Sequence, residues 1–486
     1  MKLRVKTKVK SPKSSDEGCE PVSPTSECFL TMSVTSYILC FFELEFPPHF
    51  PSIYAFLNDV FLNVHPRFSS IVVKDAKGKK KWKKIEVNIK DHVKIPLLNK
   101  DNISTEEEYS TQYDDYISEI ATSEIAVDKP LWELHIFNYP TKKSVSTLIF
   151  KFHHGIADGT SLMGVVLSCI QRSDDPSKPL TFPSRTTSIR PKENKNSHTQ
   201  TIMKLFNIVP QFMASIFYSF YDLGQSLRLL HSEDDPTPIR SGYAKINQHY
   251  RICTVNLFLT DVKRIKTILG VTVNDVVIGI IFLGTRLYMQ EMNNGRLKNT
   301  RSTVLITLNT RNDKGYARPE EMREKNTKVP WGNRFSLVEL RITNLEEEDF
   351  KNPLKFILKA HKLIKRKKNT PFAQNLMTSF FGAVRTCRGL QAATRTFERR
   401  FNNSSFLVTN MIGPTEKMSL ASHPIKGFYF MPTGLLSSLT VSVMSYMQTL
   451  TIGLAVEEGV IDHQRLITCV EKAFQLISQA ATTTSN

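Results

Sequence analysis

The sequence predicts an α/β protein made of two halves, and three observations lead to that fold class. At 486 residues the chain is too long for one ordinary hydrophobic core, so two domains or one large pseudo-duplicated fold are expected. Runs rich in β-branched and aromatic residues alternate with helix-like segments in both halves of the chain. Between the halves, residues 173–200 carry Pro, Ser and charges without periodicity, which is typical of an interdomain connection.

These observations divide the chain into four segments. Residues 1–19 predict a basic, flexible tail, because no apolar stretch follows the first lysines as it does in a signal peptide. Residues 20–172 form the first half and residues 243–486 the second half. Residues 173–242 connect the two halves and include an apolar segment of their own.

The first half is expected to begin with strands. Residues 27–47 are rich in β-branched and aromatic residues with polar interruptions, a pattern that predicts one or two buried strands. A helix then begins at Pro51 and ends before Pro66. Residues 71–89 predict a hairpin that turns at a Lys-Gly pair, with its lysine-rich tip in solvent. Residues 146–154 predict another strand, and a helix follows it directly.

The connecting segment contains an apolar run, Leu205 to Gly224, of about one membrane thickness. Asn207, Pro210 and further polar residues interrupt the run and raise the cost of inserting it into a bilayer. A single span there would also place the two halves on opposite sides of the membrane. We therefore expect an amphipathic helix that lies in the membrane interface, with a single span as the competing interpretation.

The second half alternates strands and helices in the same way. Thr272 is expected to cap a long buried helix, and Pro353 opens an amphipathic helix whose apolar face includes His361. Residues 312–330 are expected to form a polar loop. The remaining predicted elements are strands at 251–259, 302–311, 333–342, 404–414 and 439–461, and helices at 261–269, 373–401 and 463–480.

Composition narrows the classes of partner. The net charge of +18 favours an anionic partner such as an anionic membrane face or a phosphorylated substrate. The charge lies in several clusters and no nucleic-acid-binding motif accompanies it, so nucleic acid is the weaker choice. The seven cysteines are odd in number and form no C-x-x-C pair, which indicates reduced thiols facing the cytosol and no zinc site.

Two adjacent histidines, His153 and His154, end the predicted strand, and Asp158 and Gly159 follow after three intervening residues. Neighbouring side chains on a strand point to opposite faces, so we expect one histidine in the core and the other in a channel. A neutral imidazole can take the proton of an acceptor hydroxyl that attacks an activated acyl carbon. No nucleophile elbow is present, which favours direct transfer. Asp158 alone would also suit a simple helix N-cap.

These residues resemble a known family. "HHGIADG" matches the HHxxxDG pattern of acyl-CoA-dependent acyltransferases with the chloramphenicol acetyltransferase fold, a pattern shared with condensation domains of peptide synthetases. "PLWELHIF" (Pro130 to Phe137) and "TVNDVVIG" (Thr272 to Gly279) resemble the PLW and ND motifs of the wax ester synthase/diacylglycerol acyltransferase family. "EPVSPTSECFL", "TLNTRN", "WGNRFS" and "VTNMIGPTE" resemble further blocks of its plant branch, with Thr409 in place of the usual serine.

The resemblance implies two chloramphenicol-acetyltransferase-like halves with a tunnel between them, entered by CoA at one mouth and by the alcohol at the other. It implies that His154 is the proton acceptor and that His153 supports the site. Asp158 would hold the loop by ion pairing or by hydrogen bonds to the backbone. Gly159 would allow the loop to approach closely.

The resemblance also implies residues at the substrate-binding surface. Asn274 and Asp275 would stabilise the second half's face of the tunnel. Pro130, Leu131 and Trp132 would pack at the acyl-binding side, although plain core packing of Trp132 stays open.

A few lysine and arginine residues of the helix that begins at Pro353 would meet the CoA phosphates or form a solvated helix face. They are Lys362, Lys365 and Arg366.

The implied activity is O-acylation of long-chain alcohols to wax esters, and of diacylglycerol to triacylglycerol. Acyl-CoA would be a co-substrate, and no further cofactor is expected. Two alternatives stay open: an inactive lipid-binding homologue, and an HxxxD-type acyltransferase that acts on smaller alcohols or amines. The plant HxxxD branch normally carries a DFGWG block, which this sequence lacks. The implied location is the endoplasmic reticulum membrane, facing the cytosol, with the plasma membrane as the other choice.

Overall fold

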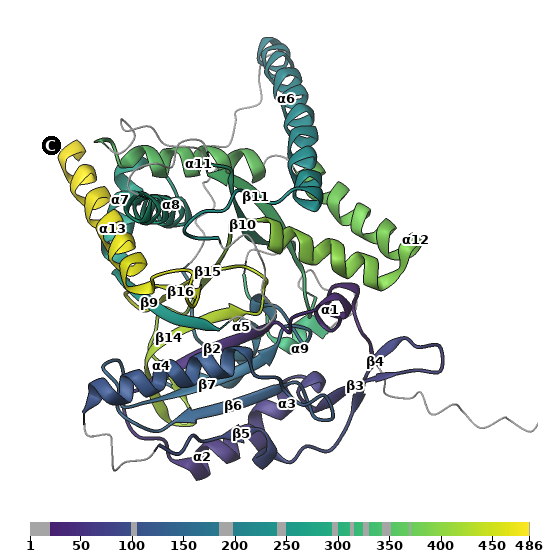
Figure 1. The fold of residues 1–486 in the computed structure, drawn as a ribbon, viewed down its shortest axis with the longest axis vertical. Coiled ribbons are helices and arrows are strands. Elements are labelled where there is room, and N and C mark those ends of the chain that lie inside the picture. The colour runs from purple at the N-terminus through teal and green to yellow at the C-terminus, as the bar shows by residue number, and fades with distance from the viewer. Residues whose placement is uncertain are drawn as a thin grey trace, which may run out of the picture.

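The protein forms mixed α/β structure with two large sheets, seen one above the other in Figure 1. The computed structural model describes residues 20–98, 105–183, 198–240, 249–293, 300–311, 315–323, 330–342, 351–368 and 371–485. The predicted tail at 1–19 and residues 184–197 of the predicted connection at 173–200 lie outside the described residues. The predicted α/β class with two halves is confirmed.

The first large sheet has seven strands in the order β5-β6-β7-β2-β14-β13-β8. Two of its strands, β13 and β14, come from the C-terminal part of the chain, and β14 pairs antiparallel with β2. Neither strand was predicted from the sequence. The strands are β2 (Tyr37–Leu44), β5 (Val93–Lys94), β6 (Trp132–Phe137), β7 (Ser146–His153), β8 (Gln171–Arg172), β13 (Met418–Leu420) and β14 (His423–Thr433).

Of the residues 27–47, predicted to form one or two strands, only 37–44 form a strand, β2. Residues Pro24–Phe29 instead form the short helix α1, because Ser23 caps it with its side chain and Pro24 fits the first helical position. This correction matters for the site, because α1 carries Phe29.

The other predicted elements of the first half are present. The helix expected from Pro51 is formed by α2 (Phe50–Ala55), a π-helical turn (Phe56–Phe61) and α3 (Leu62–Val64). The hairpin of β3 (Ser70–Lys74) and β4 (Lys80–Lys84) turns at Gly78, whose φ is 75°, and β1 (Glu20–Pro21) extends it. A further helix, α4 (Glu106–Thr122), was not predicted.

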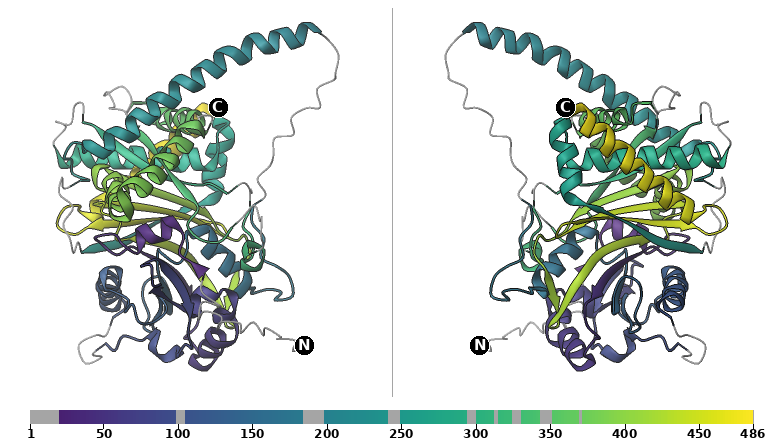
Figure 2. Two further views of the ribbon diagram at one scale, coloured as in Figure 1. Left: turned by 90° about the vertical axis from the view of Figure 1, so that its right-hand side faces the viewer. Right: turned by 90° about the vertical axis from the view of Figure 1, so that its left-hand side faces the viewer.

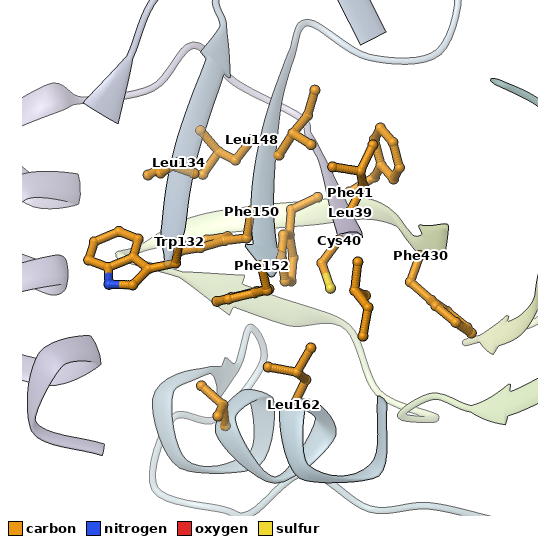
Figure 3. Packing of buried hydrophobic residues seen from close by; sticks show 14 of the residues in the cluster. Leu39, Cys40, Phe41, Trp132, Leu134, Leu148, Phe150, Phe152, Leu162 and Phe430 are labelled. Carbon is orange, nitrogen blue, oxygen red and sulfur yellow. The ribbon is translucent and has the colours of Figure 1, made fainter. Parts of the chain in front are cut away.

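Aromatic and aliphatic side chains from strands and helices fill the core of the first half (Figure 3). Burial of this apolar surface is the main favourable contribution to folding, at about 25 cal/mol per Å². The side chains labelled in Figure 3 include Leu39 and Phe41 of β2, Trp132 and Leu134 of β6, Leu148, Phe150 and Phe152 of β7, and Phe430 of β14.

The second large sheet has six strands in the order β11-β10-β12-β15-β16-β9. All of them match predicted strands, and only β9 begins one residue earlier than predicted. They are β9 (Tyr250–Phe258), β10 (Ser302–Asn309), β11 (Phe335–Ile342), β12 (Phe406–Ile412), β15 (Leu439–Tyr446) and β16 (Thr449–Glu457).

Four helices of the second half pack around one face of this sheet (Figure 1). Helix α8 is the buried centre, and Thr272 caps it as predicted. Gly279 lets α11 cross closely, because a Cβ there would lie 2.8 Å from the Cα of Ile357. The helices are α7 (Leu259–Leu269), α8 (Val273–Met292), α11 (Leu354–Lys368) and α13 (His463–Ser485), and a short helix, α9 (Pro319–Arg323), lies in the predicted polar loop.

Two long helices lie beside each other at the other side of the second half. Helix α12 (Pro371–Asn403) breaks at Gly389, whose φ is 83°. Helix α6 (His198–His231) contacts α12 and extends away from the body (Figure 2). It contains the apolar run from Leu205 to Gly224 and continues through Pro210.

A membrane span requires a helix that is long and apolar enough to cross the bilayer. No single helix among them has the length and apolar character to cross a bilayer. Helices α7 and α8 meet those requirements only when taken together, and they meet at a bend of 102°.

Candidate active site

The two histidines lie at the end of β7, where the chain turns into helix α5 (Gly159–Cys169). The backbone N–H of His154 donates to the carbonyl of Ser36 at 2.9 Å, which ties the turn to the start of β2. Asp158 caps α5 by accepting from the N–H of Ser161 at 3.0 Å, as predicted for a helix N-cap. The junction is therefore fixed at both ends by local hydrogen bonds.

The two histidine side chains point to different surroundings, as the strand geometry predicts. His153 accepts the N–H of Gly155 on Nδ1 at 2.9 Å, and its ring meets the ring of Tyr37 edge-on at 5.8 Å. The ring of His154 stacks on Phe29 of α1 with centroids 4.0 Å apart. His153 is thus held within the first half, and His154 faces the second.

Asn333 holds the ring of His154 in one tautomer. Its side-chain N–H₂ donates to the backbone carbonyl of His154 at 2.7 Å and to Ser26 Oγ at 3.2 Å. These bonds leave Asn333 Oδ1 facing His154 Nδ1 at 3.1 Å. Because Oδ1 only accepts, Nδ1 carries the proton, and Nε2 keeps a free lone pair. His154 can therefore act as a base through Nε2.

Burial keeps both imidazoles neutral at physiological pH. Burial lowers the pKa of His154 to about 4, and the hydrogen bond with Asn333 opposes that shift only in part. Burial and the neighbouring His154 lower the pKa of His153 to about 3. A neutral His154 is the form that a general base requires.

Asp158 forms an ion pair that joins the two halves. Arg311, which follows β10, donates to its two oxygens at 2.8 and 3.1 Å, and both side chains are buried. The N–H of Arg334 also donates to Asp158 Oδ2 at 2.8 Å. Arg311 further bonds Ser161 Oγ and the carbonyl of Gly332. Asp158 thus links the histidine loop to the second half.

His154 lines one cavity, and a second, larger cavity adjoins the first at Phe335. The histidine cavity, of about 100 Å³, is lined by His154, Asp158 and Gly159 and by residues of β10, β12 and β14. The large cavity, of about 600 Å³, lies between α1, β11 and α12 and is lined in part by Asn333. Phe335 lines both cavities, so its ring marks the boundary between them. The reactive nitrogen thus lies where the two halves meet.

Gly159 is required where α5 approaches β12. A Cβ at this position would lie 2.4 Å from Met411 Sδ, so any larger residue would force Met411 to move. Asn410, which precedes Met411 in β12, also lines the histidine cavity and donates to Asn274 Oδ1 at 2.9 Å. Asn274 therefore reaches the site through Asn410. Thr409, which stands where the family motif usually has serine, accepts a hydrogen bond from Thr307 Oγ1 at 2.9 Å.

Asp275 lies farther from the histidine. Its carboxylate completes a capping box with Thr272 and contacts His361 Nδ1 of α11 at 2.8 Å. It is not among the residues that line the histidine cavity or the large cavity. The structure places Asp275 as a helix-capping residue, and contact with substrate stays a prediction.

The Pro130, Leu131 and Trp132 set lies at the start of β6, beside the end of β7. The carbonyl of Leu131 accepts the N–H of His153 at 3.0 Å. Trp132 is fully buried, donates through Nε1 to the carbonyl of Phe68 at 2.8 Å and lines neither cavity. This geometry matches the core-packing interpretation of Trp132, and an acyl-binding role of the set stays a prediction.

Three residues of the site were not singled out from the sequence: Asn333, Arg311 and Asn410. Each lies in one of the three later blocks, "WGNRFS", "TLNTRN" and "VTNMIGPTE", so the blocks were the available signal. Within the ranges that the structure describes, no three His, Cys, Asp or Glu side chains are arranged to hold a metal ion.

The protonation of His154 predicts how activity and stability depend on pH. The base is neutral above about pH 5, so kcat/KM is expected to stay level down to that pH and to fall below about pH 4. In the unfolded chain the histidines have a pKa of about 6.5, so below that pH they bind protons that the folded histidines do not bind. The free energy of unfolding is therefore highest above pH 6.5 and decreases as the pH falls toward 4. Initial rates and urea midpoints across this range check both trends. A kcat/KM that falls already near pH 6.5 would contradict a buried neutral base.

Comparison with known proteins agrees with this geometry. The wax ester synthase/diacylglycerol acyltransferase catalytic domain matches residues 65–277, and the WS/DGAT C-terminal domain matches residues 331–478. Wax ester synthase/diacylglycerol acyltransferase 4 of Arabidopsis thaliana is 28% identical over 86% of this chain and 82% of its own. Wax ester synthase/diacylglycerol acyltransferase 6 of the same plant is 27% identical over 95% of this chain and 93% of its own.

A solved structure has the same fold. The wax ester synthase/diacylglycerol acyltransferase from Marinobacter aquaeolei VT8 superposes with a TM-score of 0.58 at 15% identity and covers 95% of this chain and 100% of that one. The two domain matches together cover most of the chain, including the histidine loop, Asn333, Asn410 and the first turn of helix α8. The chain belongs to the wax ester synthase/diacylglycerol acyltransferase family and is an acyltransferase.

Proposed function

We propose that this protein transfers a fatty acyl group from acyl-CoA to a long-chain alcohol, giving a wax ester, and also to diacylglycerol, with His154 as the general base. The observation that carries the proposal is the hydrogen bond of 3.1 Å between His154 Nδ1 and Asn333 Oδ1. It leaves Nε2 of His154 unprotonated, and His154 lines the histidine cavity.

The reaction needs only one proton carrier. Nε2 of His154 takes the proton of the acceptor hydroxyl while that oxygen attacks the thioester carbonyl carbon. The tetrahedral intermediate then collapses, the carbon–sulfur bond breaks, and the imidazolium returns its proton to the CoA sulfur. No covalent acyl-enzyme is formed, because the acceptor and the donor react directly with each other.

The large cavity has a size and lining that suit a long acyl or alkyl chain. Its volume of about 600 Å³ falls within the range of pockets that enclose ligands of moderate size. Phe335, Met377, Phe381 and Phe397 give one side of it an apolar surface. Such an apolar side favours a long-chain acceptor over a small polar one.

An acceptor screen tests the proposal. Purified protein is mixed with labelled palmitoyl-CoA and, in turn, hexadecanol, diacylglycerol, butanol and a primary amine, and the products are separated. We expect label in the hexadecyl ester first and in triacylglycerol second. Binding of acyl-CoA without any ester would favour the lipid-binding homologue instead. A preference for butanol or the amine would favour an acyltransferase of smaller acceptors.

We further propose that α6 lies in the cytosolic leaflet of the endoplasmic reticulum membrane. Met213, Phe217, Phe220 and Tyr221 are all exposed and recur at the spacing of one helix face. Figure 2 places their helix on the outside of the molecule. Such docking would let alcohols and diacylglycerol reach the site without crossing water.

Replacing both Phe217 and Phe220 with serine is expected to weaken vesicle binding by about tenfold or more, because each phenyl ring buried in lipid contributes about 1.5–3 kcal/mol. Flotation with phospholipid vesicles measures this. Phe258→Ser, at a ring 72% exposed on another element, is the matched control and should bind as the parent does. Unchanged flotation of the double variant would contradict the interfacial helix. Asn402 and Asn403 are N-x-S glycosylation sites that a single membrane span would place in the lumen, so their glycosylation in microsomes would contradict it too.

A further inference from the structure

A second site lies beyond the large cavity, beneath the C-terminal part of α6. It is a cavity of about 420 Å³, here called the basic cavity, and four cationic side chains line it. Glu339 is the one carboxylate in its lining. The cations come from three elements: Arg228 of α6, Arg341 of β11, and Arg366 and Lys367 of α11.

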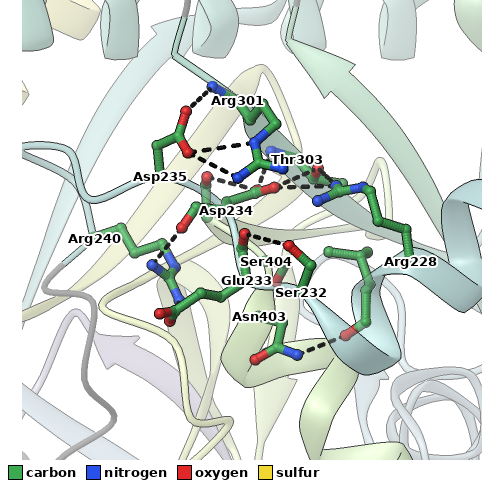
Figure 4. A network of polar contacts seen from close by, with 12 residues as sticks. Arg228, Ser232, Glu233, Asp234, Asp235, Arg240, Arg301, Thr303, Asn403 and Ser404 are labelled. Carbon is green, nitrogen blue, oxygen red and sulfur yellow. Dashed lines mark hydrogen bonds and ion pairs between the residues drawn. The ribbon is translucent and has the colours of Figure 1, made fainter.

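Positive charge exceeds negative charge around this cavity. Arg228 contacts Asp234 at 3.2 Å, as Figure 4 shows. Arg366 and Lys367 share the single buried carboxylate of Asp222, at 3.3 and 2.8 Å. Glu339 itself forms an ion pair with the buried Arg400 of α12. Within the described part of the chain, five cations therefore face three carboxylates here, and an unbalanced charge at a partly buried position is costly unless an anion joins it.

Two of the cations have donors to spare. Arg228 Nη1 is buried and has no hydrogen-bond partner among the described residues. Arg341 lies exposed on the edge strand β11 and has no ion pair or side-chain hydrogen bond within the described ranges. Guanidinium groups bind phosphate through paired, charge-assisted N–H···O bonds, so these donors suit a phosphate group.

The basic cavity also lies at a particular distance from His154. Phe335, Glu339 and Arg341 share one face of β11, because they are separated by even numbers of residues. At about 3.3 Å per residue, Glu339 lies about 13 Å and Arg341 about 20 Å along the strand from Phe335. Glu339 and Lys367 line both the large cavity and the basic cavity. The two cavities are therefore neighbours along one strand.

This span matches the arm of CoA. Between its sulfur and its nearest phosphate lie about 13 bonds, comparable to little more than four extended residues, or about 15 Å. A thioester at the ring of Phe335, beside His154, would place that phosphate between Glu339 and Arg341. The arm itself would then lie along β11 in the large cavity.

We propose that the basic cavity binds the phosphate-bearing end of an amphiphilic ligand, with Arg341 and Arg228 as its main contacts, and that this ligand is the CoA of the acyl donor. The assignment rests on the proposed function. A phospholipid headgroup carries the same chemistry and would arrive from a membrane against α6, so the experiment separates the two sources.

The experiment compares Arg341→Gln with the parent, and Lys263→Gln is the matched control because Lys263 is an exposed cation of α7 outside the cavity. KM is measured for palmitoyl-CoA and for palmitoyl-pantetheine, which has the same thioester and no phosphate. We expect KM for palmitoyl-CoA to rise about tenfold or more in Arg341→Gln, and KM for palmitoyl-pantetheine to stay unchanged. Arg341→Lys should restore part of the loss, and Lys263→Gln should change neither value.

Direct binding keeps this test separate from the proposed function. Calorimetry with CoA alone should show the same weakening in Arg341→Gln even if no ester is ever formed. Cosedimentation with phosphatidylglycerol vesicles forms the second arm. A loss of vesicle binding with unchanged CoA affinity would keep the phosphate site and overturn CoA as its ligand. Unchanged CoA affinity together with unchanged vesicle binding would overturn the site itself.

Discussion

Replacing His154 with alanine is expected to lower kcat by about 10²- to 10⁴-fold, the usual contribution of a general base, while the protein still folds. The ring lies against Phe29 and Asn333 at the edge of a cavity, so its removal leaves space that water can enter. The other supports of the loop, at Ser36 and Asp158, do not depend on the imidazole. Initial rates with palmitoyl-CoA and hexadecanol measure the effect.

The control for this variant is His463→Ala, at a half-buried histidine that begins α13, on an element that lines neither cavity. It should retain the kcat of the parent. Circular dichroism and the thermal midpoint establish that the His154 variant is folded. Turnover within a few-fold of the parent in folded His154→Ala would remove the general-base role.

Replacing Asp158 with alanine is expected to lower stability and activity together. Both guanidinium contacts of Arg311 to Asp158 would be lost, and a buried cation without its carboxylate costs about 3–5 kcal/mol. The cap on Ser161 and the bond to the Arg334 N–H would also be lost. Because these contacts join the two halves beside His154, the site should lose its geometry with them. Urea denaturation and initial rates, measured on the same preparation, check this.

Asp462→Ala is the matched control for that loss. Asp462 accepts the N–H of Arg465 at the start of α13, so its removal costs a helix cap of about 1 kcal/mol far from the histidines. It should leave the specific activity unchanged. An Asp158 variant that is as stable as the parent yet inactive would indicate a direct role of the carboxylate in the reaction.

Local features of the site could be predicted from the sequence. The strand-to-helix junction, the opposite directions of His153 and His154 and the cap at Asp158 all depend on residues within a few positions of one another. The same holds for Thr272, whose side chain caps α8. Such features follow from backbone geometry and short-range hydrogen bonds, and the family resemblance supplied the chemistry.

Long-range contacts could not be predicted in this way. Asn333 is 179 residues from His154, and Arg311 is 153 residues from Asp158. No periodicity or spacing joins such pairs, because only the packing of the second half brings them to the loop. The tautomer of His154 and the ion pair that fixes the site were therefore visible only in the structure.

Strand β14 was missed for a related reason. Its sequence contains Pro424, Gly427 and Pro432, which weaken the local signal for a strand. The strand forms because it pairs with β2, almost four hundred residues earlier, and adds Phe430 to the core of the first half. Tertiary pairing thus overrides the local propensity, and the second half closes the first sheet through it.

A single-turnover experiment tests most directly whether the acyl group passes straight from CoA to the alcohol at His154. Protein in excess over labelled palmitoyl-CoA is quenched at short times, with and without hexadecanol, and label is counted in the protein, ester and thioester fractions. The account predicts that label moves from CoA to the ester only when the alcohol is present, and that none becomes bound covalently to the protein. Label that accumulates on the protein in the absence of alcohol, and then passes to the ester when alcohol is added, would contradict it.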